Sequence, residues 1–280
     1  MLQTERLDPR MSHTGRRHLK TTFNQDAELY DRARPKYPTR LFDDLVALAG
    51  IEPGARLLEV GCGTGQATVP MAKRGFRIVC VELGENLAAV ARRNLAPYPN
   101  VRVVTAPFET WDASGETFAL VYASQAWHWL DPDVSYAKAA DLLSPRGALA
   151  INDVEHAFPA DVDRFFFDIQ DVYHEIGEDS PWHEEWPPPL PEDVPDMRDE
   201  IEASGLFGDF RSRRYLWEVI YTAKEYIDLL NTFSGHIAME PEKREFLYRH
   251  VRERIDALPG KCVRRHWLAI LNAARKVSDQ

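Results

Sequence analysis

The sequence has few cysteines and no long apolar run. Its three cysteines, Cys62, Cys80 and Cys262, are odd in number and far apart, which argues against a disulfide framework and fits a reducing compartment. No segment reaches the roughly 20 apolar residues of a membrane span. The basic stretch 10–20 lacks the apolar centre of a secretory signal. We therefore expect a cytoplasmic protein with no membrane partner.

Positive charge is also scarce. The chain has 34 Lys and Arg against 44 Asp and Glu, a formal net charge of −10, which disfavours a nucleic acid partner because such binding needs clustered cations. The nine histidines form no metal-binding pattern with each other, with Glu or with Cys, so no metal is expected. With 280 residues and 44% hydrophobic content, the chain predicts a globular protein. We expect it to be a monomer or a homodimer.

Helical and strand periods alternate from residue 37 to residue 152, which is typical of a doubly wound α/β sheet. Short apolar runs predict strands at 56–60, 77–81, 101–105, 118–123 and 148–151. Helical spacing occurs at 41–49, 66–74, 86–95 and 134–143. Two later strands, 213–221 and 263–271, would complete a seven-stranded sheet, with helices at 224–232 and 241–258.

A turn with the sequence G-C-G-T-G follows the first strand at 61–65. Glycine permits positive φ and lets a ligand approach the backbone closely. Glu82 closes the second strand roughly 20 residues further on, the spacing at which α/β nucleotide folds place a carboxylate on ribose hydroxyls. The pattern predicts a nucleotide-like ligand at this turn.

Two kinds of cofactor fit such a turn. A dinucleotide site has the spacing G-x-G-x-x-G, but here Gln66 occupies the position of the third glycine. Glu59, two residues before Gly61, would attract an amino group or a sulfonium and repel a diphosphate. Spacing and charge thus disfavour a nicotinamide dinucleotide, which stays open as an alternative.

With these motifs, residues 23–152 resemble the class I S-adenosylmethionine-dependent methyltransferases. The resemblance implies a Rossmann-like, mostly parallel seven-stranded sheet with an antiparallel final strand and a lid insertion. It also implies S-adenosylmethionine as cofactor, S-adenosylhomocysteine as product, and no metal. Glu59 would lie near the methionine part of the cofactor, Glu82 would bind the ribose, and Leu83 would cover the adenine. The turn would offer its backbone at Gly61, Cys62, Gly63 and Gly65.

The resemblance assigns further cofactor contacts. Ala106 stands where many members have an Asp near the adenine, so the contacts there fall to Pro107, Phe108 and Glu109. Ser124, at the end of the fourth strand, would also contact the cofactor. Segment 30–38 resembles a leader that folds a short helix over the cofactor. There Tyr30 and Arg34 would bind, with the planar fork of Arg34 suited to the methionine carboxylate, unless both only anchor the N-terminus.

The acceptor side is predicted mainly after the fourth strand, because open α/β sheets bind ligands beyond the carboxyl ends of their strands. His128 would be a general base there, or would only order its loop through hydrogen bonds. Ser234 and His236 belong to a segment that resembles the C-terminal part of actinobacterial-type methyltransferases, or form a helix-ending polar cluster. The full predicted substrate pocket is Tyr37, Gln125, Trp127, Trp129, Ser234 and His236.

Composition changes after Asn152. The proline-rich segment 178–200, with Trp182 and Trp186, is either a plain loop or a lid over the substrate. We expect four parts. They are a flexible leader at 1–20, a cofactor-binding core with a cap helix at 21–152, a lid insertion at 153–212, and elements that complete the sheet and the substrate pocket at 213–280.

The sequence predicts an enzyme that transfers a methyl group from S-adenosylmethionine to an oxygen, nitrogen or carbon atom of a small molecule. Its main task is to align the acceptor with the sulfonium methyl and to exclude water. A base is needed only where the acceptor must lose a proton. A non-catalytic protein that binds S-adenosylmethionine and a nicotinamide-dependent oxidoreductase are the alternatives, and the identity of the acceptor stays open.

Overall fold

The structure is a computed structural model that describes residues 26–178 and 188–277. The chain divides into two compact units. The first unit contains residues 1–35, 155–195 and 216–268, and the second contains 36–154, 196–215 and 269–280. The predicted leader 1–20 and the two tryptophans of the predicted lid, Trp182 and Trp186, lie outside the described residues. The predicted division into four parts stays a prediction.

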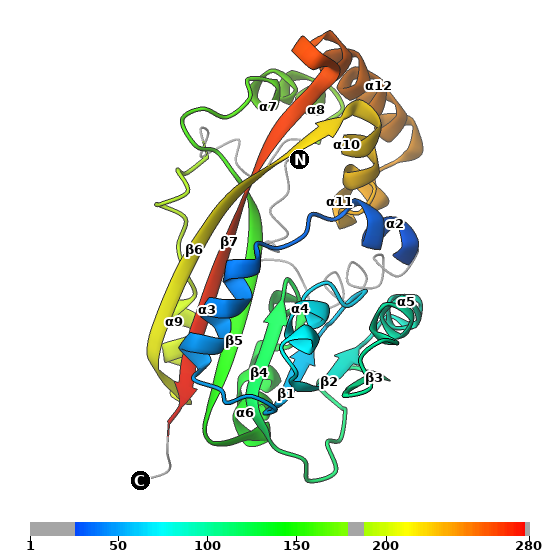
Figure 1. The fold of residues 1–280 in the computed structure, drawn as a ribbon. Helices are drawn as coiled ribbons and strands as arrows, with labels where there is room; N and C mark the ends of the chain where they lie inside the picture. Colours follow the sequence, from blue (N-terminus) through cyan, green and yellow to red (C-terminus); the bar gives the residue numbers. More distant parts are fainter. Residues whose placement is uncertain (1–25, 179–187, 278–280) are drawn as a thin grey trace. The chain divides into compact units, whose positions relative to one another are not determined.

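The sheet has seven strands in the order β3-β2-β1-β4-β5-β7-β6 (Figure 1). The last strand, β7, is antiparallel and the other six are parallel, so the predicted Rossmann-like fold is confirmed. The strands are β1 (Arg56–Val60), β2 (Arg77–Glu82), β3 (Val101–Thr105), β4 (Phe118–Ser124), β5 (Leu143–Ala157), β6 (Phe207–Thr222) and β7 (Cys262–Lys276). The last three are much longer than expected because polar residues interrupt their apolar pattern.

Strand order reverses at β1, which pairs in parallel with β2 on one side and β4 on the other. Register places Glu59 opposite both Cys80 and Tyr122, while Glu82 is opposite Thr105. In open α/β sheets the crevice at such a reversal, beyond the carboxyl ends of the strands, is the usual place for a ligand. The turn at 61–65 and the segment after β4 both leave the sheet at this point.

Helices cover both faces of the sheet in the second unit. One face packs against α6 (Pro132–Leu142) and α9 (Arg198–Ala203), which share a core with β1, β2, β4 and β5. Helix α4 (Thr68–Lys73) packs on the opposite face, where the Thr68 hydroxyl contacts the thiol of Cys80 on β2. Helices α3 (Thr39–Ala49) and α5 (Glu85–Leu95) contact α4.

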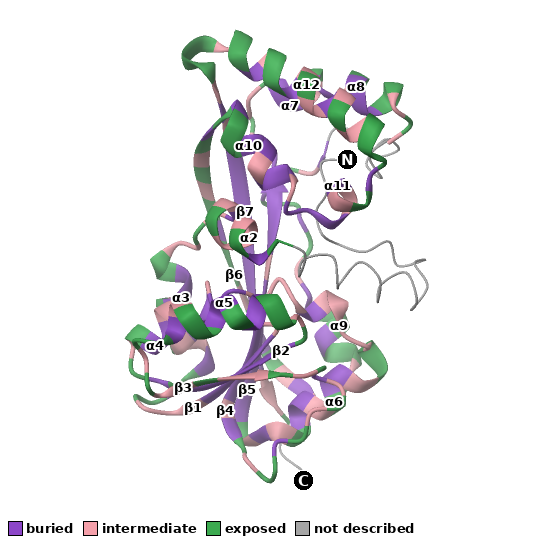
Figure 2. Cartoon of the chain, turned by 90° about the vertical axis from the view of Figure 1, so that its right-hand side faces the viewer, coloured by how far each residue is buried: buried purple, intermediate pink, exposed green. Residues whose placement is uncertain are grey.

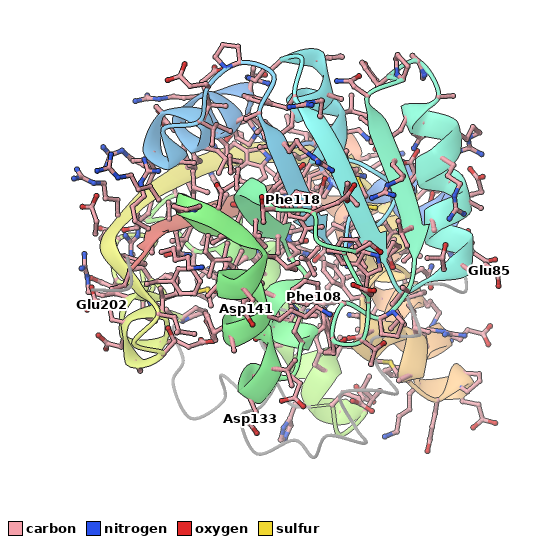
Figure 3. The ribbon with its side chains drawn as sticks, turned by 90° about the horizontal axis from the view of Figure 1, so that it is seen from below. Glu85, Phe108, Phe118, Asp133, Asp141 and Glu202 are labelled. Carbon is pink, nitrogen blue, oxygen red and sulfur yellow. The ribbon has the colours of Figure 1, made fainter. Side chains whose placement is uncertain are left out.

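The burial pattern explains why these elements form. Figure 2 shows α5 with both buried and exposed stretches, and the buried ones are the apolar positions of an amphipathic helix. Seen from below in Figure 3, Phe118 and Phe108 lie among the interior side chains, whereas Asp133 and Glu202 lie at the outside. Helix α6 begins at Pro132 because the Asp131 side chain accepts a hydrogen bond from the Asp133 N–H.

The first unit is mainly helical around the remaining parts of β5, β6 and β7. Helix α10 packs against α2 and α12, and α12 packs against α8. The helices are α2 (Ala27–Ala33), α7 (Phe165–Asp168), α8 (Gln170–Glu175), α10 (Ala223–Leu230), α11 (Ser234–Ala238) and α12 (Pro241–Ala257). Helices α7, α8, α9 and α11 were not predicted, since pieces of four to six residues have too little periodicity. Among the described residues, no helix has the length and apolar character needed to cross a membrane.

Candidate cofactor and active site

The glycine turn adopts a conformation that needs glycine. Gly61, Gly63 and Gly65 have φ of 68°, 55° and 90°. A Cβ on Gly61 would lie 2.4 Å from the Cβ of Ala126, and the Gly61 N–H donates to the Val81 carbonyl over 2.8 Å. The turn is therefore held against both β2 and the segment that follows β4.

Glu82 braces this turn from the end of β2. One carboxylate oxygen accepts from the Gly63 N–H over 2.8 Å, and the other accepts from the Gly84 N–H over 2.7 Å. Burial raises the pKa of Glu82, and these backbone hydrogen bonds oppose the rise. A carboxylate has about four acceptor sites, so each oxygen retains capacity for a ribose hydroxyl. Leu83, the next residue, is 37% exposed and available to pack on a ring.

Glu59 lies in a buried network between β1, β2, β4 and α4. Its carboxylate accepts a hydrogen bond from the Tyr122 hydroxyl over 2.6 Å and a further bond from Thr68. Burial raises the pKa of Glu59 to about 7. Tyr122 and Thr68 were not among the predicted site residues, although the strand register pairs Tyr122 with Glu59. A position of Glu59 near the methionine part of the cofactor stays a prediction.

The two cysteines near the turn are neutral thiols. Cys62 and Cys80 are buried, and the Cys62 thiol donates to the Gly63 carbonyl over 3.7 Å. Cys80 and burial together raise the pKa of Cys62 well above its ordinary value. Cys62 thus presents no thiolate, and contact of its backbone with the cofactor stays a prediction.

The segment predicted to meet adenine is tied to its surroundings. Phe108 is buried, with its ring centroid 6.4 Å from that of Trp127, and the Lys138 ammonium lies 5.4 Å from its centroid. Lys138 also donates to the Glu109 carbonyl over 3.2 Å, and the Pro107 carbonyl accepts from the Trp111 N–H. These bonds fix the backbone of 107–109, while contact with adenine stays a prediction.

The residues after β4 include a histidine beside a carboxylate. His128 Nδ1 lies 3.5 Å from Asp153 Oδ1, and both side chains are largely buried. Asp153 was not predicted, and it lies two residues after the end of the predicted fifth strand, which neighbours the fourth. Gln125 has a φ of 56°, and its amide donates to the Val154 carbonyl over 2.7 Å. His128 Nδ1 and Asp153 Oδ1 form no hydrogen bond within the described residues, so a general base here would need the carboxylate to approach the imidazole more closely.

The two tryptophans beside His128 have different surroundings. Trp127 is 2% exposed and packs edge-on against Tyr136, with centroids 5.2 Å apart. Trp129 is half-buried, with its ring centroid 5.0 Å from that of His128. Ser124, at the end of β4, is also half-buried. Trp127 is thus part of the core, and Trp129 is placed to bound a site around His128.

Four predicted site residues belong to the first unit. Arg34 is buried, donates to the Thr232 hydroxyl and carbonyl at 2.8 Å each, and lies 4.9 Å from the ring centroid of Tyr30. His236 is fully buried, 3.4 Å from the Tyr173 hydroxyl, and Ser234 is buried at the start of α11. Contacts of these four with the cofactor or the acceptor stay predictions.

Tyr37 lies in the second unit, where its ring packs edge-on against Phe42 with centroids 6.0 Å apart. Its place in a substrate pocket stays a prediction. Within the described ranges, no group of three or more His, Cys, Asp or Glu side chains is arranged to hold a metal ion.

Comparison with known proteins points to one chemistry. A family model described as a methyltransferase domain matches residues 57–147, which run from β1 into β5. Rv3342 of Mycobacterium tuberculosis, described as an uncharacterized methyltransferase, is 25% identical over 245 residues, which are 88% of this chain and 90% of that protein.

Solved structures share the fold. A putative type II methyltransferase from Anaeromyxobacter dehalogenans superposes with a TM-score of 0.60 at 22% identity, covering 86% of this chain and 97% of that one. A phosphoethanolamine N-methyltransferase from Haemonchus contortus, solved with phosphomonomethylethanolamine and S-adenosylhomocysteine, has a TM-score of 0.53 at 13% identity. That match covers 97% of this chain and 62% of the Haemonchus chain.

Proposed function

Since the chain belongs to the class I S-adenosylmethionine-dependent methyltransferases, we propose that it methylates a small-molecule acceptor. The observation that supports the cofactor part is the glycine turn braced by Glu82, whose two oxygens accept from the Gly63 and Gly84 N–H groups. The Haemonchus enzyme, which shares the fold, was solved with S-adenosylhomocysteine and a small phosphorylated amine, and this supports a small acceptor here.

The residues of the second unit divide the work of binding. S-adenosylmethionine supplies an electrophilic methyl group when bound. Glu82 holds the ribose, the glycine turn approaches through its backbone, and Leu83 covers the adenine. Because internal hydrogen bonds hold this framework, few of its groups need to become ordered when the cofactor binds.

His128 takes a proton where the acceptor is a hydroxyl or a carbon acid. Asp153, 3.5 Å away, orients the imidazole and stabilises the imidazolium that forms. An amine acceptor that arrives neutral needs no such base. The pair therefore allows the enzyme to methylate acceptors that must first lose a proton, in addition to neutral amines.

A cytoplasmic location and a partner set limited to small molecules complete the proposal. The free thiols Cys62, Cys80 and Cys262 suit a reducing compartment. The net charge of −10 opposes binding to nucleic acid. We take the protein as a monomer or a homodimer.

Calorimetry on the full chain with S-adenosylmethionine, S-adenosylhomocysteine and NAD tests the cofactor. We expect the first two to bind and NAD to give no heat, and the reverse result would support a nicotinamide oxidoreductase. Release of S-adenosylhomocysteine with a panel of phenols, amines and acids then tests turnover. Tight cofactor binding without product from any of them would support the non-catalytic alternative.

A further inference from the structure

Arg265, in the part of β7 that belongs to the first unit, is a buried cation that pairs with no carboxylate of the described residues. It is 1% exposed, and its Nε has no hydrogen-bond partner within the described part of the chain. Its guanidinium makes one long contact, 3.4 Å from Nη1 to the Tyr226 hydroxyl. Removing an unpaired charge from water is costly, so this arrangement needs an explanation.

The neighbouring arginine shows the ordinary alternative. Arg264 is one residue earlier on the same strand, and its guanidinium pairs with Asp161 at 3.2 Å and with Glu218 at 3.3 Å. Its side chain is 35% exposed. Successive residues of a strand face opposite sides. The chain thus neutralises the arginine on one side of β7 and leaves the arginine on the other side without an acid.

Aromatic rings surround Arg265 but do not satisfy it. Its guanidinium carbon lies 4.1 Å from the ring centroid of Trp267, 5.3 Å from that of Phe233 and 5.9 Å from that of Tyr226. Such faces stabilise a cation through the ring quadrupole. They leave the Nε–H without an acceptor, and the N–H groups in the guanidinium plane are the ones that bind a carboxylate or a phosphate in a fork.

A further donor on the same side of the sheet lacks an acceptor. The indole N–H of Trp217 is buried and forms no hydrogen bond within the described residues, whereas Trp267 and the Tyr221 hydroxyl form a side-chain hydrogen bond with each other. The rings of Trp217 and Trp267 stack with centroids 6.5 Å apart, and β6 and β7 are neighbours in the sheet. Arg265 lowers the pKa of Tyr221, which burial raises, so the hydroxyl lies near the guanidinium. An unpaired donor near a buried cation suits a ligand with acceptor oxygens.

A second arginine adds positive charge. Arg34 is 5% exposed, and its guanidinium lies 4.5 Å from the ring centroid of Phe233, the ring that Arg265 also contacts. Burial lowers the pKa of Arg265, and the charge of Arg34 contributes to the lowering. An anion bound at Arg265 would relieve this repulsion.

We propose that Arg265 binds a carboxylate or a phosphate group of a small-molecule anion. The proposal goes beyond the proposed function and rests on the buried guanidinium of the first unit.

Thermal unfolding of the full chain tests the site without knowledge of the acceptor. The probes are sodium phosphate and sodium succinate, each titrated against sodium chloride at constant ionic strength. We expect a saturable rise in Tm with at least one probe and none with chloride, because only a ligand of the folded state stabilises it. A response to phosphate alone identifies a phosphate site, and one to succinate alone a carboxylate site. No rise with either would overturn the proposal.

Arg265→Met and its matched control Arg264→Met locate the effect. We expect Arg265→Met to weaken the responding anion at least tenfold and to leave the Tm in chloride unchanged or higher, because it removes an unpaired buried charge. Arg264→Met should bind the anion as the wild type does. If Arg265→Met lowers the Tm in chloride while anion binding persists, Arg265 is structural and the proposal fails. Should that variant not fold, Arg265→Lys, which keeps the charge but loses the fork, should still weaken binding at least fivefold.

One readout separates this proposal from the proposed function. Calorimetry with S-adenosylhomocysteine should give the same affinity in the wild type and in Arg265→Met. Absence of that binding in the wild type would contradict the methyltransferase proposal and leave the anion site standing.

Discussion

The two units of this protein treat buried charge in opposite ways. In the second unit, the carboxylates of Glu59 and Glu82 are buried and receive hydrogen bonds from the chain itself, from Tyr122 and from backbone N–H groups. In the first unit, the guanidinium of Arg265 is buried among aromatic rings, and no acid of the described residues pairs with it. The two carboxylates thus have partners within the chain, whereas the guanidinium has no counterion in the part of the chain that the structure describes.

We attribute the difference to what each region is proposed to recognise. A shared cofactor such as S-adenosylmethionine always presents the same ribose and adenine, so the chain can prearrange its partners and avoid the cost of ordering them on binding. A buried charge without a partner is tolerated only where it serves a function that offsets its cost. We infer that the first unit keeps the charge of Arg265 for an anionic ligand.

The largest predicted effect is the loss of the glycine turn. Gly61→Ala would place a Cβ 2.4 Å from that of Ala126 and at a φ of 68°, so we expect binding of S-adenosylhomocysteine to weaken at least several hundredfold. Gly54→Ala is the matched control, since its φ of 76° imposes a similar strain while nothing lies within 4 Å of the new Cβ. Calorimetry on both variants decides, and equal loss would show that strain, not the contact with Ala126, matters.

Glu59→Gln tests whether the carboxylate of the second unit is held without charge. Because its folded pKa of about 7 exceeds the usual 4.5, ionisation disfavours the folded state as pH rises from about 4.5 through 7, and the effect is absent below 4.5. Across that range, the free energy of unfolding of Glu59→Gln should rise by about 3 kcal/mol relative to that of the wild type. Urea unfolding from pH 4 to 8 measures it, and a constant gap would mean that Glu59 is solvated.

Local sequence was enough to predict the second unit and its cofactor turn. The strands up to 123 are short apolar runs, and the turn at 61–65 and Glu82 belong to one strand-helix-strand segment. Such features depend on neighbours in the chain, so spacing and residue type reveal them. The fold was predicted correctly on that basis, and the enzyme class was predicted correctly from the family resemblance that these motifs carry.

The features that escaped prediction are those that depend on distant residues. Asp153 faces His128 only because β5 lies beside β4, and the charge of Arg265 is notable only because no acid of a distant segment reaches it. The sequence R-R at 264–265 reads as two ordinary surface cations until the strand shows which one is buried. Burial and pairing of a charge are tertiary properties, which periodicity does not contain.

His128→Ala should lower turnover by roughly 100-fold and leave the affinity for S-adenosylhomocysteine unchanged, if the acceptor must lose a proton. Asp153→Asn should give a smaller loss in the same direction, because the imidazole keeps its place but loses the adjacent charge. The measurement is kcat with an acid acceptor from the panel. A rise in KM with kcat unchanged would make His128 a binding residue and shift selectivity toward the second unit.

The smallest predicted effect concerns Glu82, which can bind the cofactor, stabilise the glycine turn, or do both. Glu82→Gln keeps one acceptor oxygen for the Gly63 or Gly84 N–H and loses the charge, so we expect S-adenosylhomocysteine to bind roughly tenfold more weakly, about 1 to 2 kcal/mol. Glu85→Gln, at the exposed start of α5, should leave the affinity unchanged. Calorimetry and urea unfolding of both variants separate the roles. A loss of stability with no loss of affinity would mean that Glu82 stabilises the turn and that other groups bind the ribose. The partners of the Glu82 carboxylate would then be the backbone N–H groups of the turn, and not the cofactor.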